Sequence, residues 1–498
     1  MPYHFEKTKA ILAVIQQRID AAIYQHVQEL AITAWVTAEP VPYAARQSGQ
    51  EKQLILGEPW AKLWDCAWMH VTGQVPASAA GKKVVLLIDL NGEALLVDAE
   101  GNPALGLTTI SSEFDLRLGM PGKRVIEMFD PAHGGEIVDL WLDAAANDLF
   151  GKYQNNGQLR EAHIATCNES MRQLSHDFFV LHEMTVVLPE SSARRAQILA
   201  SLFEAANQLV DYTDAEALAA RAILGVELGK TGGSPSLTLS AIGHAHMDLA
   251  WLWPLRETIR KGARTFATVL AMMDRYPDYV FGASQPQLYQ WVKSYYPALY
   301  ERVKQKVADG RWEIQGGMWV EPDTNISGGE ALIRQLLHGV EFFEQEFGKT
   351  PRMLWLPDVF GYSGALPQLL KKSGIDYFMT IKISWSLFNT FPHHTFIWEG
   401  IDGSQVLAHM PPEGTYNSSA APRALVTSEK EFRDKYVSDR ALLVFGIGDG
   451  GGGPGTDHLE NLAREKNLAG LPAVMQEPAE AFFDRIKADS HKYKTWVG

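Results

Sequence analysis

Cysteine is scarce in this sequence, and long apolar runs are absent from it. Only Cys66 and Cys167 occur among 498 residues, too few for a disulfide framework, so we expect a reducing compartment and a cytoplasmic location. No run of about 18 apolar residues exists, so no transmembrane helix is predicted. The first residues lack a basic segment followed by an apolar one, so no signal peptide is predicted either.

Basic tracts are absent as well. Lysine and arginine number 45 against 59 aspartates and glutamates, which gives a net charge of −14. This balance argues against nucleic acid or an anionic membrane as a partner, and it favours a neutral or cationic small ligand. The glycine run Gly450–Gly453 is not followed by the Lys-Ser/Thr pair of a phosphate-binding P-loop, so phosphate binding is not predicted there.

Changes in composition divide the chain, which is long enough for roughly two to four domains, into four parts. We expect an N-terminal helical segment, a β-sandwich-like domain, a helical connector with a linker, and an α/β domain, in this order: 1–35, 36–145, 146–235 and 236–498. The clearest boundary is the linker Lys230–Pro235, where breaker residues gather.

Local patterns support this division. Apolar residues at helical spacing predict a helix within 3–30, and further helices are predicted at 158–172, 191–210 and 214–228. Before the connector, short β-rich runs separated by Gly, Pro and Asn-Gly turns predict an antiparallel sandwich. After position 236, strands and helices alternate, which predicts a parallel sheet, either open or closed into a barrel. The fold class expected is therefore α/β, with a parallel (β/α) barrel-like domain.

The most informative stretch runs from Ser236 to Pro254. It begins as an alternating apolar strand and ends in His244, His246 and Asp248, polar groups that a buried strand could not carry without partners. Residues two apart on an extended backbone point to the same side, so His246 and Asp248 can converge on zinc or another first-row divalent metal. A hydrogen-bonded His–Asp pair at a strand end is the other reading.

Polar and aromatic groups also follow the later strands, where α/β folds bind ligands. These groups are Glu321, Asp323, Asp358, Lys382, Trp385, Tyr416, Asn417 and Asp449. A divalent ion, two separate carboxylates and aromatic walls fit glycoside hydrolysis, in which one carboxylate attacks the sugar and the other protonates the leaving oxygen. Asp358 and Asp449 are the candidates from position alone.

Other aromatic and histidine motifs have two readings each. Trp251 and Trp253 either bind a sugar ring or pack in the core. Three further tryptophans either line a carbohydrate-binding face of the sandwich or, the favoured reading, pack its core: Trp60, Trp64 and Trp68. The pair His176-Asp177 has apolar neighbours and is read as structural.

Several long motifs resemble glycoside hydrolase family 38, the class II α-mannosidases, and most of all the branch with cytosolic and vacuolar members. The resemblance covers residues 236 to about 460 closely. It lies in His244-Ala-His-Met-Asp-Leu-Ala-Trp-Leu-Trp253, Gln315-Gly-Gly-Met-Trp-Val-Glu-Pro-Asp323, Trp355-Leu-Pro-Asp-Val-Phe-Gly-Tyr-Ser363, Lys382-Ile-Ser-Trp385 and Phe445-Gly-Ile-Gly-Asp-Gly-Gly-Gly-Gly-Pro454.

The resemblance implies a retaining, zinc-dependent α-mannosidase acting on terminal α-linked mannose of oligosaccharides or glycosides. It implies one Zn²⁺ held by His246, Asp248 and Asp358, with Asp358 also the nucleophile and Asp449 the general acid/base. Glu413 is the substitute if Asp449 does not serve. The implied substrate contacts are Trp251, Phe360, Lys382 and Tyr416.

Two other functions stay open: a metal-dependent carbohydrate deacetylase, which needs no nucleophilic carboxylate, and a non-catalytic sugar-binding protein. The family completes its zinc site with a histidine in a later His-Asp motif, and neither His458 nor His491 is followed by Asp. We therefore expect a chain truncated at its C-terminus that lacks this fourth ligand. Such a chain is expected to bind zinc weakly, to show little activity and to associate into homo-oligomers through apolar surface.

Overall fold

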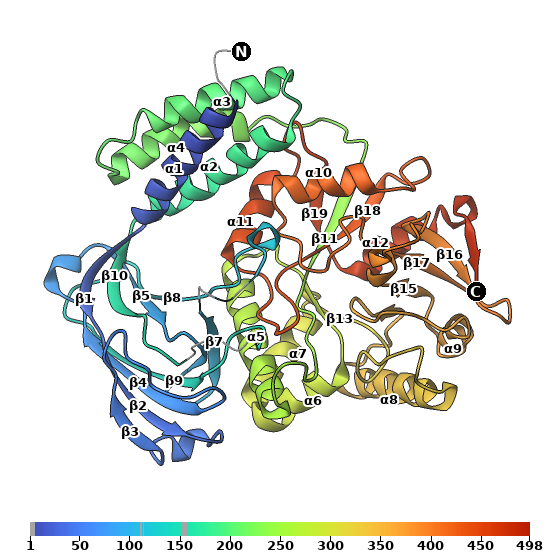
Figure 1. The fold of residues 1–498 in the computed structure, drawn as a ribbon, viewed down its shortest axis with the longest axis horizontal. Coiled ribbons are helices and arrows are strands. Elements are labelled where there is room, and N and C mark those ends of the chain that lie inside the picture. The colour runs from blue at the N-terminus through green and yellow to red at the C-terminus, as the bar shows by residue number, and fades with distance from the viewer. Residues whose placement is uncertain (1–4, 110–111, 113, 152–156) are drawn as a thin grey trace.

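The computed structural model describes residues 5–109, 112, 114–151 and 157–498, which form a sandwich, a helical bundle and an α/β region (Figure 1). The sandwich consists of two antiparallel sheets that enclose an apolar core. The strand order of the four-stranded sheet is β1 (Tyr24–Glu29), β10 (Glu161–Cys167), β5 (Lys83–Asp89), β8 (Val125–Phe129). The order of the six-stranded sheet is β3 (Gln50–Gln53), β2 (Ala31–Thr37), β4 (Cys66–Gln74), β9 (Ile137–Ala145), β6 (Glu93–Val97), β7 (Pro103–Thr108).

The sandwich reaches beyond the range 36–145 on both sides. Its strands begin at Tyr24, within the predicted N-terminal helix, and end at Cys167, within the helix predicted at 158–172. Strand β1 is polar because it lies at a sheet edge, where most of its side chains face solvent. Strand β10 is fixed by pairing with β1 and β5, a long-range contact that overrides its helical spacing.

The helical bundle lies above the sandwich in Figure 1. It contains α1 (Phe5–Ala21), α2 (Glu169–Val187), α3 (Ala193–Ala206) and α4 (Asp214–Leu228). The last two confirm helices predicted from the sequence, and α4 begins with a capping box between Thr213 and Glu216. Among the described residues, none of the helices combines the length and apolarity that crossing a membrane requires.

The α/β region confirms the predicted alternation of strands and helices. Its first sheet is parallel, in the order β13 (Trp312–Ile314), β12 (Phe281–Ala283), β11 (Thr238–His244), β18 (Arg440–Phe445), with β19 (Ala473–Gln476) also on β11. Its second sheet is mixed, in the order β14 (Met353–Trp355), β15 (Tyr377–Met379), β17 (Gln405–His409), β16 (Thr395–Glu399), β20 (Thr495–Val497). The helices are α5 (Leu255–Arg275), α6 (Pro286–Tyr295), α7 (Pro297–Ala308), α8 (Gly329–Phe347), α9 (Leu366–Lys372), α10 (Pro422–Glu431), α11 (Thr456–Glu465) and α12 (Ala479–Lys487).

Closure into one barrel is not found among the described residues. Among the described residues no strand ladder joins the two sheets, and their main chains meet in isolated bridges, Thr324 with Tyr362 and Ser418 with Phe445. Strands β13 and β14, which would have to pair, are three residues each and are separated by the long segment 315–328 and helix α8. The carboxyl ends of β11, β14 and β18 nonetheless come together, and this convergence creates the site described below.

Buried charges join the sandwich to the α/β region. On α5, Lys261 donates to Glu93 of β6 at 2.5 Å, and Arg260 pairs with Asp143 of β9. Glu257 and Arg264 complete the same network, whose side chains are almost entirely inaccessible to solvent. Because charges withdrawn from water need mutual partners, this network fixes α5 against the sandwich.

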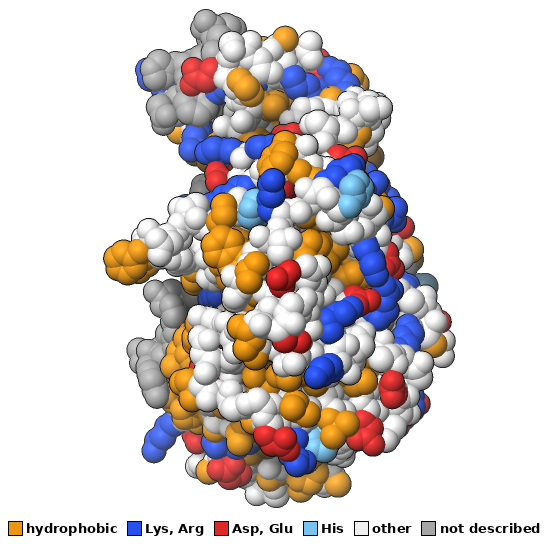
Figure 2. Space-filling model, turned by 90° about the vertical axis from the view of Figure 1, so that its right-hand side faces the viewer, with side chains coloured by type: hydrophobic (Ala, Val, Ile, Leu, Met, Phe, Trp, Pro, Cys, Tyr) orange, Lys and Arg blue, Asp and Glu red, His pale blue; other side chains and the backbone are white. Residues whose placement is uncertain are grey.

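Apolar side chains spread over the face in Figure 2, which looks onto the side of the α/β region that carries its C-terminal strand. Exposed apolar residues of this part of the chain include Leu387, Phe388, Ile401, Trp496 and Val497. Association into homo-oligomers through such surface stays a prediction.

Candidate functional site

Three predicted ligands converge at the carboxyl ends of the strands. His246 and Asp248 follow β11, Asp358 follows β14, and one ligand atom from each lies within 4.8 Å of the others. Within the described part of the chain, no other group of three or more His, Cys, Asp and Glu side chains has this arrangement. His244, by contrast, is structural, because its Nδ1 lies 2.9 Å from the carbonyl of Gly282 and its Nε2 accepts from Trp355.

A third carboxylate, that of Glu321, orients His246. Its Nδ1 lies 3.0 Å from Glu321 Oε2, while its Nε2 lies 3.5 Å from Asp248 Oδ1 and 3.8 Å from Asp358 Oδ2. Ser284 donates to the other oxygen of Glu321 at 2.9 Å, which holds that carboxylate in place. Burial acts to lower the pKa of His246, but the charges of Glu321 and Asp248 outweigh it and hold this pKa well above its ordinary value.

The surroundings of His246 fit a divalent cation. Its Nε2 is buried and makes no hydrogen bond within the described residues, yet it faces two carboxylates. An imidazole nitrogen and two carboxylate oxygens suit zinc, and a carboxylate on the other ring nitrogen is the usual outer partner of such a ligand. The sequence placed Glu321 at a strand end but gave no reason to pair it with His246.

Lys382 and Tyr416 both contact Asp358. Lys382 Nζ lies 2.7 Å from Asp358 Oδ1, and it also lies 3.5 Å from the ring centroid of Trp385. Tyr416 Oη lies 2.8 Å from the same Asp358 oxygen, and its ring packs against His246 at 4.9 Å. Both residues therefore reach the cluster, as the resemblance implied for substrate contacts, and they reach it through the carboxylate expected to be the nucleophile.

Tyr416 also reaches Asp449. Its Oη lies 2.6 Å from Asp449 Oδ1, so one phenol hydroxyl contacts both candidate catalytic carboxyl groups. Burial, reinforced by the charges of Asp449 and Asp358, raises the pKa of Tyr416 well above its ordinary value. Tyr416 therefore keeps its proton.

Asp449 occupies an unusual backbone conformation. Its φ is 62°, in the left-handed region that residues other than glycine rarely adopt. Its carbonyl accepts from Asp248 N at 2.9 Å, and the next residue, Gly450, forms a bridge with Met247. Burial raises the pKa of the Asp449 carboxyl, and the hydrogen bond with Tyr416 offsets this only in part.

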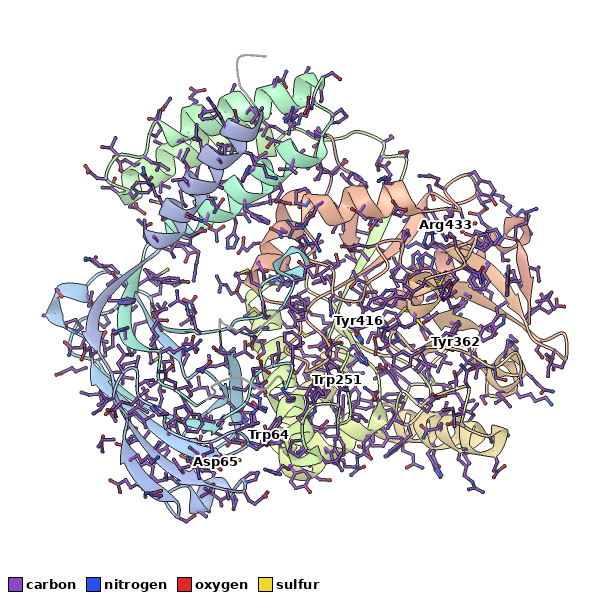
Figure 3. All side chains as sticks on the ribbon, viewed as in Figure 1. Trp64, Asp65, Trp251, Tyr362, Tyr416 and Arg433 are labelled. Atoms are coloured by element: carbon purple, nitrogen blue, oxygen red, sulfur yellow. The ribbon has the colours of Figure 1, made fainter. Side chains whose placement is uncertain are left out.

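Two aromatic side chains near these loops are open to solvent. Trp251 is 55% exposed and Phe360 is 81% exposed, which are high values for such large apolar groups. Trp251 packs edge-on against the buried Trp253, and Phe360 lies 5.8 Å from Lys382 Nζ. Figure 3 places Trp251 and Tyr416 in the same central part of the α/β region.

Other candidates lie outside the cluster. Trp60 and Trp68 are buried and donate to main-chain carbonyls, which confirms the core reading for these two. Glu413 is half-buried; desolvation of its carboxyl raises its pKa to about 7, and Ser418 is its hydrogen-bond partner. The ring of His458 is also buried, and its Nδ1 accepts from the Gly455 amide.

Comparison with known proteins identifies the family of the chain. A family model described as the N-terminal domain of glycosyl hydrolases family 38 matches residues 236–498, and a model described as an alpha-mannosidase jelly roll domain matches residues 27–175. The chain therefore belongs to glycosyl hydrolase family 38, which confirms the family predicted from its motifs.

Relatives match nearly the whole chain. Human alpha-mannosidase 2C1 is 36% identical over 94% of this chain and 45% of its own length. Alpha-mannosidase G of Dictyostelium discoideum is 35% identical over 92% and 43%, and the alpha-mannosidase of Saccharomyces cerevisiae is 33% identical over 90% and 43%. The chain thus spans less than half the length of the curated relatives it matches.

Proposed function

We propose that this chain carries the site of a retaining, metal-dependent α-mannosidase that removes terminal α-linked mannose from oligosaccharides or glycosides. Membership of family 38 and relatives named alpha-mannosidase support the reaction class. The observation that carries the proposal is the hydroxyl of Tyr416, which lies within hydrogen-bond distance of Asp358 and of Asp449.

The roles of the two carboxyl groups follow from counting protons. A phenol hydroxyl has one hydrogen, so it can donate to only one of its two neighbours, and the other must donate to the phenol oxygen. The ammonium of Lys382, 2.7 Å from Asp358, favours a charged Asp358 as the acceptor. The proton then resides on Asp449, where a general acid needs it.

The reaction proceeds in two displacements. Asp358 attacks the anomeric carbon, the bond to the leaving oxygen breaks, and Asp449 gives its proton to that oxygen. Asp449, now ionised, takes a proton from water, whose oxygen attacks the anomeric carbon and releases mannose and free Asp358. The anomeric configuration is inverted twice and so retained.

The spacing of the carboxyl groups supports retention. Asp358 Oδ1 lies 2.8 Å and Asp449 Oδ1 lies 2.6 Å from the same atom, Tyr416 Oη. The distance between these two carboxyl oxygens therefore cannot exceed the sum of the two contacts. That limit agrees with the separation of roughly 5–5.5 Å in retaining glycosidases and lies below the roughly 6.5–9.5 Å of inverting ones.

We propose zinc as the metal, held by His246, Asp248 and Asp358, because this donor set fits it. When bound, the ion supplies Lewis-acid charge that stabilises sugar oxygens in the transition state. Glu321 keeps the ring of His246 turned so that Nε2 faces the two aspartates.

The remaining residues bind the sugar. Trp251 and Phe360 offer exposed aromatic faces for stacking, and Lys382 and Tyr416 offer donors beside the nucleophile. We also propose a cytoplasmic location, supported by the small number of cysteines.

A 2-deoxy-2-fluoro-α-mannosyl fluoride tests the proposal by trapping the first displacement. We expect the intact mass to rise by one fluoromannosyl group, with Asp358 as the labelled residue. Asp358→Asn should lose the label, the bound zinc and at least about 10⁴-fold in turnover of an aryl α-mannoside. Asp309→Asn, an exposed helix-terminal aspartate, is the control and should keep all three.

The other two functions predict different results. A deacetylase would release acetate from acetylated sugars and carry no label on Asp358. A sugar-binding protein would bind mannose without turnover or label. Turnover of α-linked mannobioses, assayed with and without added zinc, separates the mannosidase from both alternatives, and acetate release separates the deacetylase from the sugar-binding protein.

A further inference from the structure

The loop that carries Asp449 is held from outside the α/β region. This Asp449 loop (residues 446–455) lies between α5 and a segment that continues from sandwich strand β9, which we call the anchor segment (residues 147–151). Gly450 shows how close the contact is, because a Cβ atom there would lie 1.5 Å from the carbonyl oxygen of Leu149. No side chain fits at that position.

A buried lysine holds the anchor segment itself. Lys261 Nζ donates to the carbonyls of Leu149 at 2.9 Å and Asp148 at 3.2 Å. Its charge is met by Glu93 of the sandwich at 2.5 Å, and the side chain is fully buried. The carbonyl under Gly450 therefore has a fixed position set by groups of both regions.

Apolar packing reinforces this contact. Leu149 and Phe150 form a small buried cluster with Ile447, two residues before Asp449, and Phe114 packs on it. The rings of Phe114 and Phe150 stack at 5.1 Å with an interplanar angle of 2°. Only Ile447 comes from the Asp449 loop, so the other three residues of the cluster belong to the N-terminal part of the chain.

A third set of contacts holds the last residues of the loop. Lys123 of the sandwich donates from Nζ to the carbonyl of Gly453 at 3.3 Å, and the amide of Gly452 donates to Thr265 of α5 at 2.8 Å. The amide of Met120 reaches Asp457, just after the loop, at 3.1 Å. The loop and the start of α11 are thus contacted at several points by groups from before residue 151.

We infer that the sandwich domain positions the general acid, with Leu149 and Lys123 as positioning residues that hold Asp449 in its left-handed conformation against Tyr416. An aspartate at a φ of 62° is strained and persists only where its surroundings fix it. The loop itself is rich in glycine and cannot supply that rigidity. The inference rests on the proposed role of Asp449.

The anchor segment also touches the loop of Trp251. A Cβ atom on Gly151 would lie 2.8 Å from the carbonyl oxygen of Leu252 and 2.9 Å from the ring of Trp253. One segment of the sandwich domain therefore packs against both the loop of the acid and the loop of an exposed aromatic residue proposed to bind the sugar.

Hydrogen exchange measured by mass spectrometry on the full chain tests the inference without depending on activity. Leu149→Ala and Lys123→Met should each speed exchange of peptides covering 446–455 by roughly tenfold, since the amides of Gly452 and Gly453 are hydrogen-bonded only while the loop is held. Exchange in α8, far from the contact, should not change. The matched controls are Leu142→Ala, a buried leucine of the sandwich core, and Lys52→Met, whose ammonium donates to the carbonyl of Trp60 instead.

Activity gives a second readout that general destabilisation would not reproduce. If Leu149 and Lys123 act through Asp449, their variants should lose turnover on alkyl mannosides more than on activated aryl mannosides, with KM little changed. Unchanged exchange in 446–455, or an equal rise in Leu142→Ala, would overturn the inference. Faster exchange in 446–455 with equal losses on both substrates would support the mechanical contact and reject Asp449 as the acid.

Discussion

The hydroxyl of Tyr416 lies 2.6 Å from the carboxyl of Asp449, a contact between the loop that follows β17 and the loop that follows β18. These strands belong to different sheets, so the contact spans the gap where a closed barrel would have paired strands. The site is therefore completed by side chains at a place where the main chains of the two sheets meet only in the isolated bridge of Ser418 with Phe445 among the described residues.

Replacing Tyr416 by phenylalanine tests this contact. Tyr416→Phe keeps the ring against His246 but removes the hydroxyl, so we expect kcat to fall about 10- to 100-fold, the loss of one hydrogen bond to a charged group of roughly 1.5–3 kcal/mol. Bound zinc, measured by mass spectrometry of the metal, should be unchanged. Tyr279→Phe is the control, because that buried hydroxyl has no hydrogen-bond partner among the described residues. An unchanged kcat in Tyr416→Phe would remove this hydroxyl from the mechanism.

Replacing Asp449 by asparagine should make turnover depend strongly on how good the leaving group of the substrate is. We expect Asp449→Asn to lower turnover of alkyl mannosides by about 10²- to 10⁴-fold and that of dinitrophenyl mannoside far less, because a good leaving group needs little protonation. Zinc should stay bound. Glu413→Gln, which alters the other candidate acid, should leave the ratio of the two rates unchanged. If Glu413→Gln changes that ratio and Asp449→Asn does not, the acid is Glu413.

Glu321 should control metal affinity without being a ligand. Glu321→Gln keeps the size of the side chain but removes the charge beside His246 Nδ1, so we expect zinc affinity to fall about 10- to 100-fold. Competition with a chromogenic chelator measures this. Raising the zinc concentration should restore turnover to Glu321→Gln but not to Asp358→Asn. Wild-type affinity in Glu321→Gln would show that the orientation of His246 is fixed by other groups.

A carboxyl that is not one of the candidate metal ligands should make stability depend on pH. Glu313 belongs to β13, and its carboxylate accepts from the amides of Ala479 and Glu480 at the start of α12. Burial raises its pKa from 4.5 to about 7. Between pH 4.5 and about pH 7, the Glu313 carboxyl is protonated in the folded chain and ionised in the unfolded chain. The stability that Glu313 contributes is therefore full below about pH 4.5 and is lost as the pH rises through about 7.

Glu313→Gln removes this titration. Relative to the wild type, the variant should gain up to about 3 kcal/mol of unfolding free energy between pH 5 and pH 8, at about 1.4 kcal/mol per unit of pKa shift. Thermal unfolding at several pH values measures the difference. Glu301→Gln, at an exposed position of α7, is the control and should show none. A gain that is the same at every pH would contradict the prediction.

The sequence predicted which side chains would come together because the rule that it used is topological. Parallel strands bring their carboxyl ends together, so His246, Asp248, Asp358 and Asp449 could be grouped without coordinates. This rule does not predict which pairs of side chains contact each other within the site. Nothing in a linear pattern says that Glu321 faces His246 or that Tyr416 contacts two carboxyl groups, because both depend on side-chain positions set by packing.

The fold was predicted where local and long-range forces agree. Helices α3 and α4 carry capping residues and apolar spacing, and both were predicted nearly to their ends. Strands β1 and β10 were missed because their identity comes from pairing across more than a hundred residues. Their own sequences are polar or helix-like, and pairing outweighs such preferences.

The buried ionic network between α5 and the sandwich restricts how chains of this kind could be recombined. Lys261, Arg264 and Glu93 share one set of contacts, so a hybrid that took its sandwich from one relative and its α/β region from another would bring mismatched charges into a dry interface. One unmatched charge of this kind costs about 3–5 kcal/mol, a large part of the stability of a typical domain. The two regions are therefore expected to change together during evolution, and a designer who exchanges one must carry over the matching charges of the other.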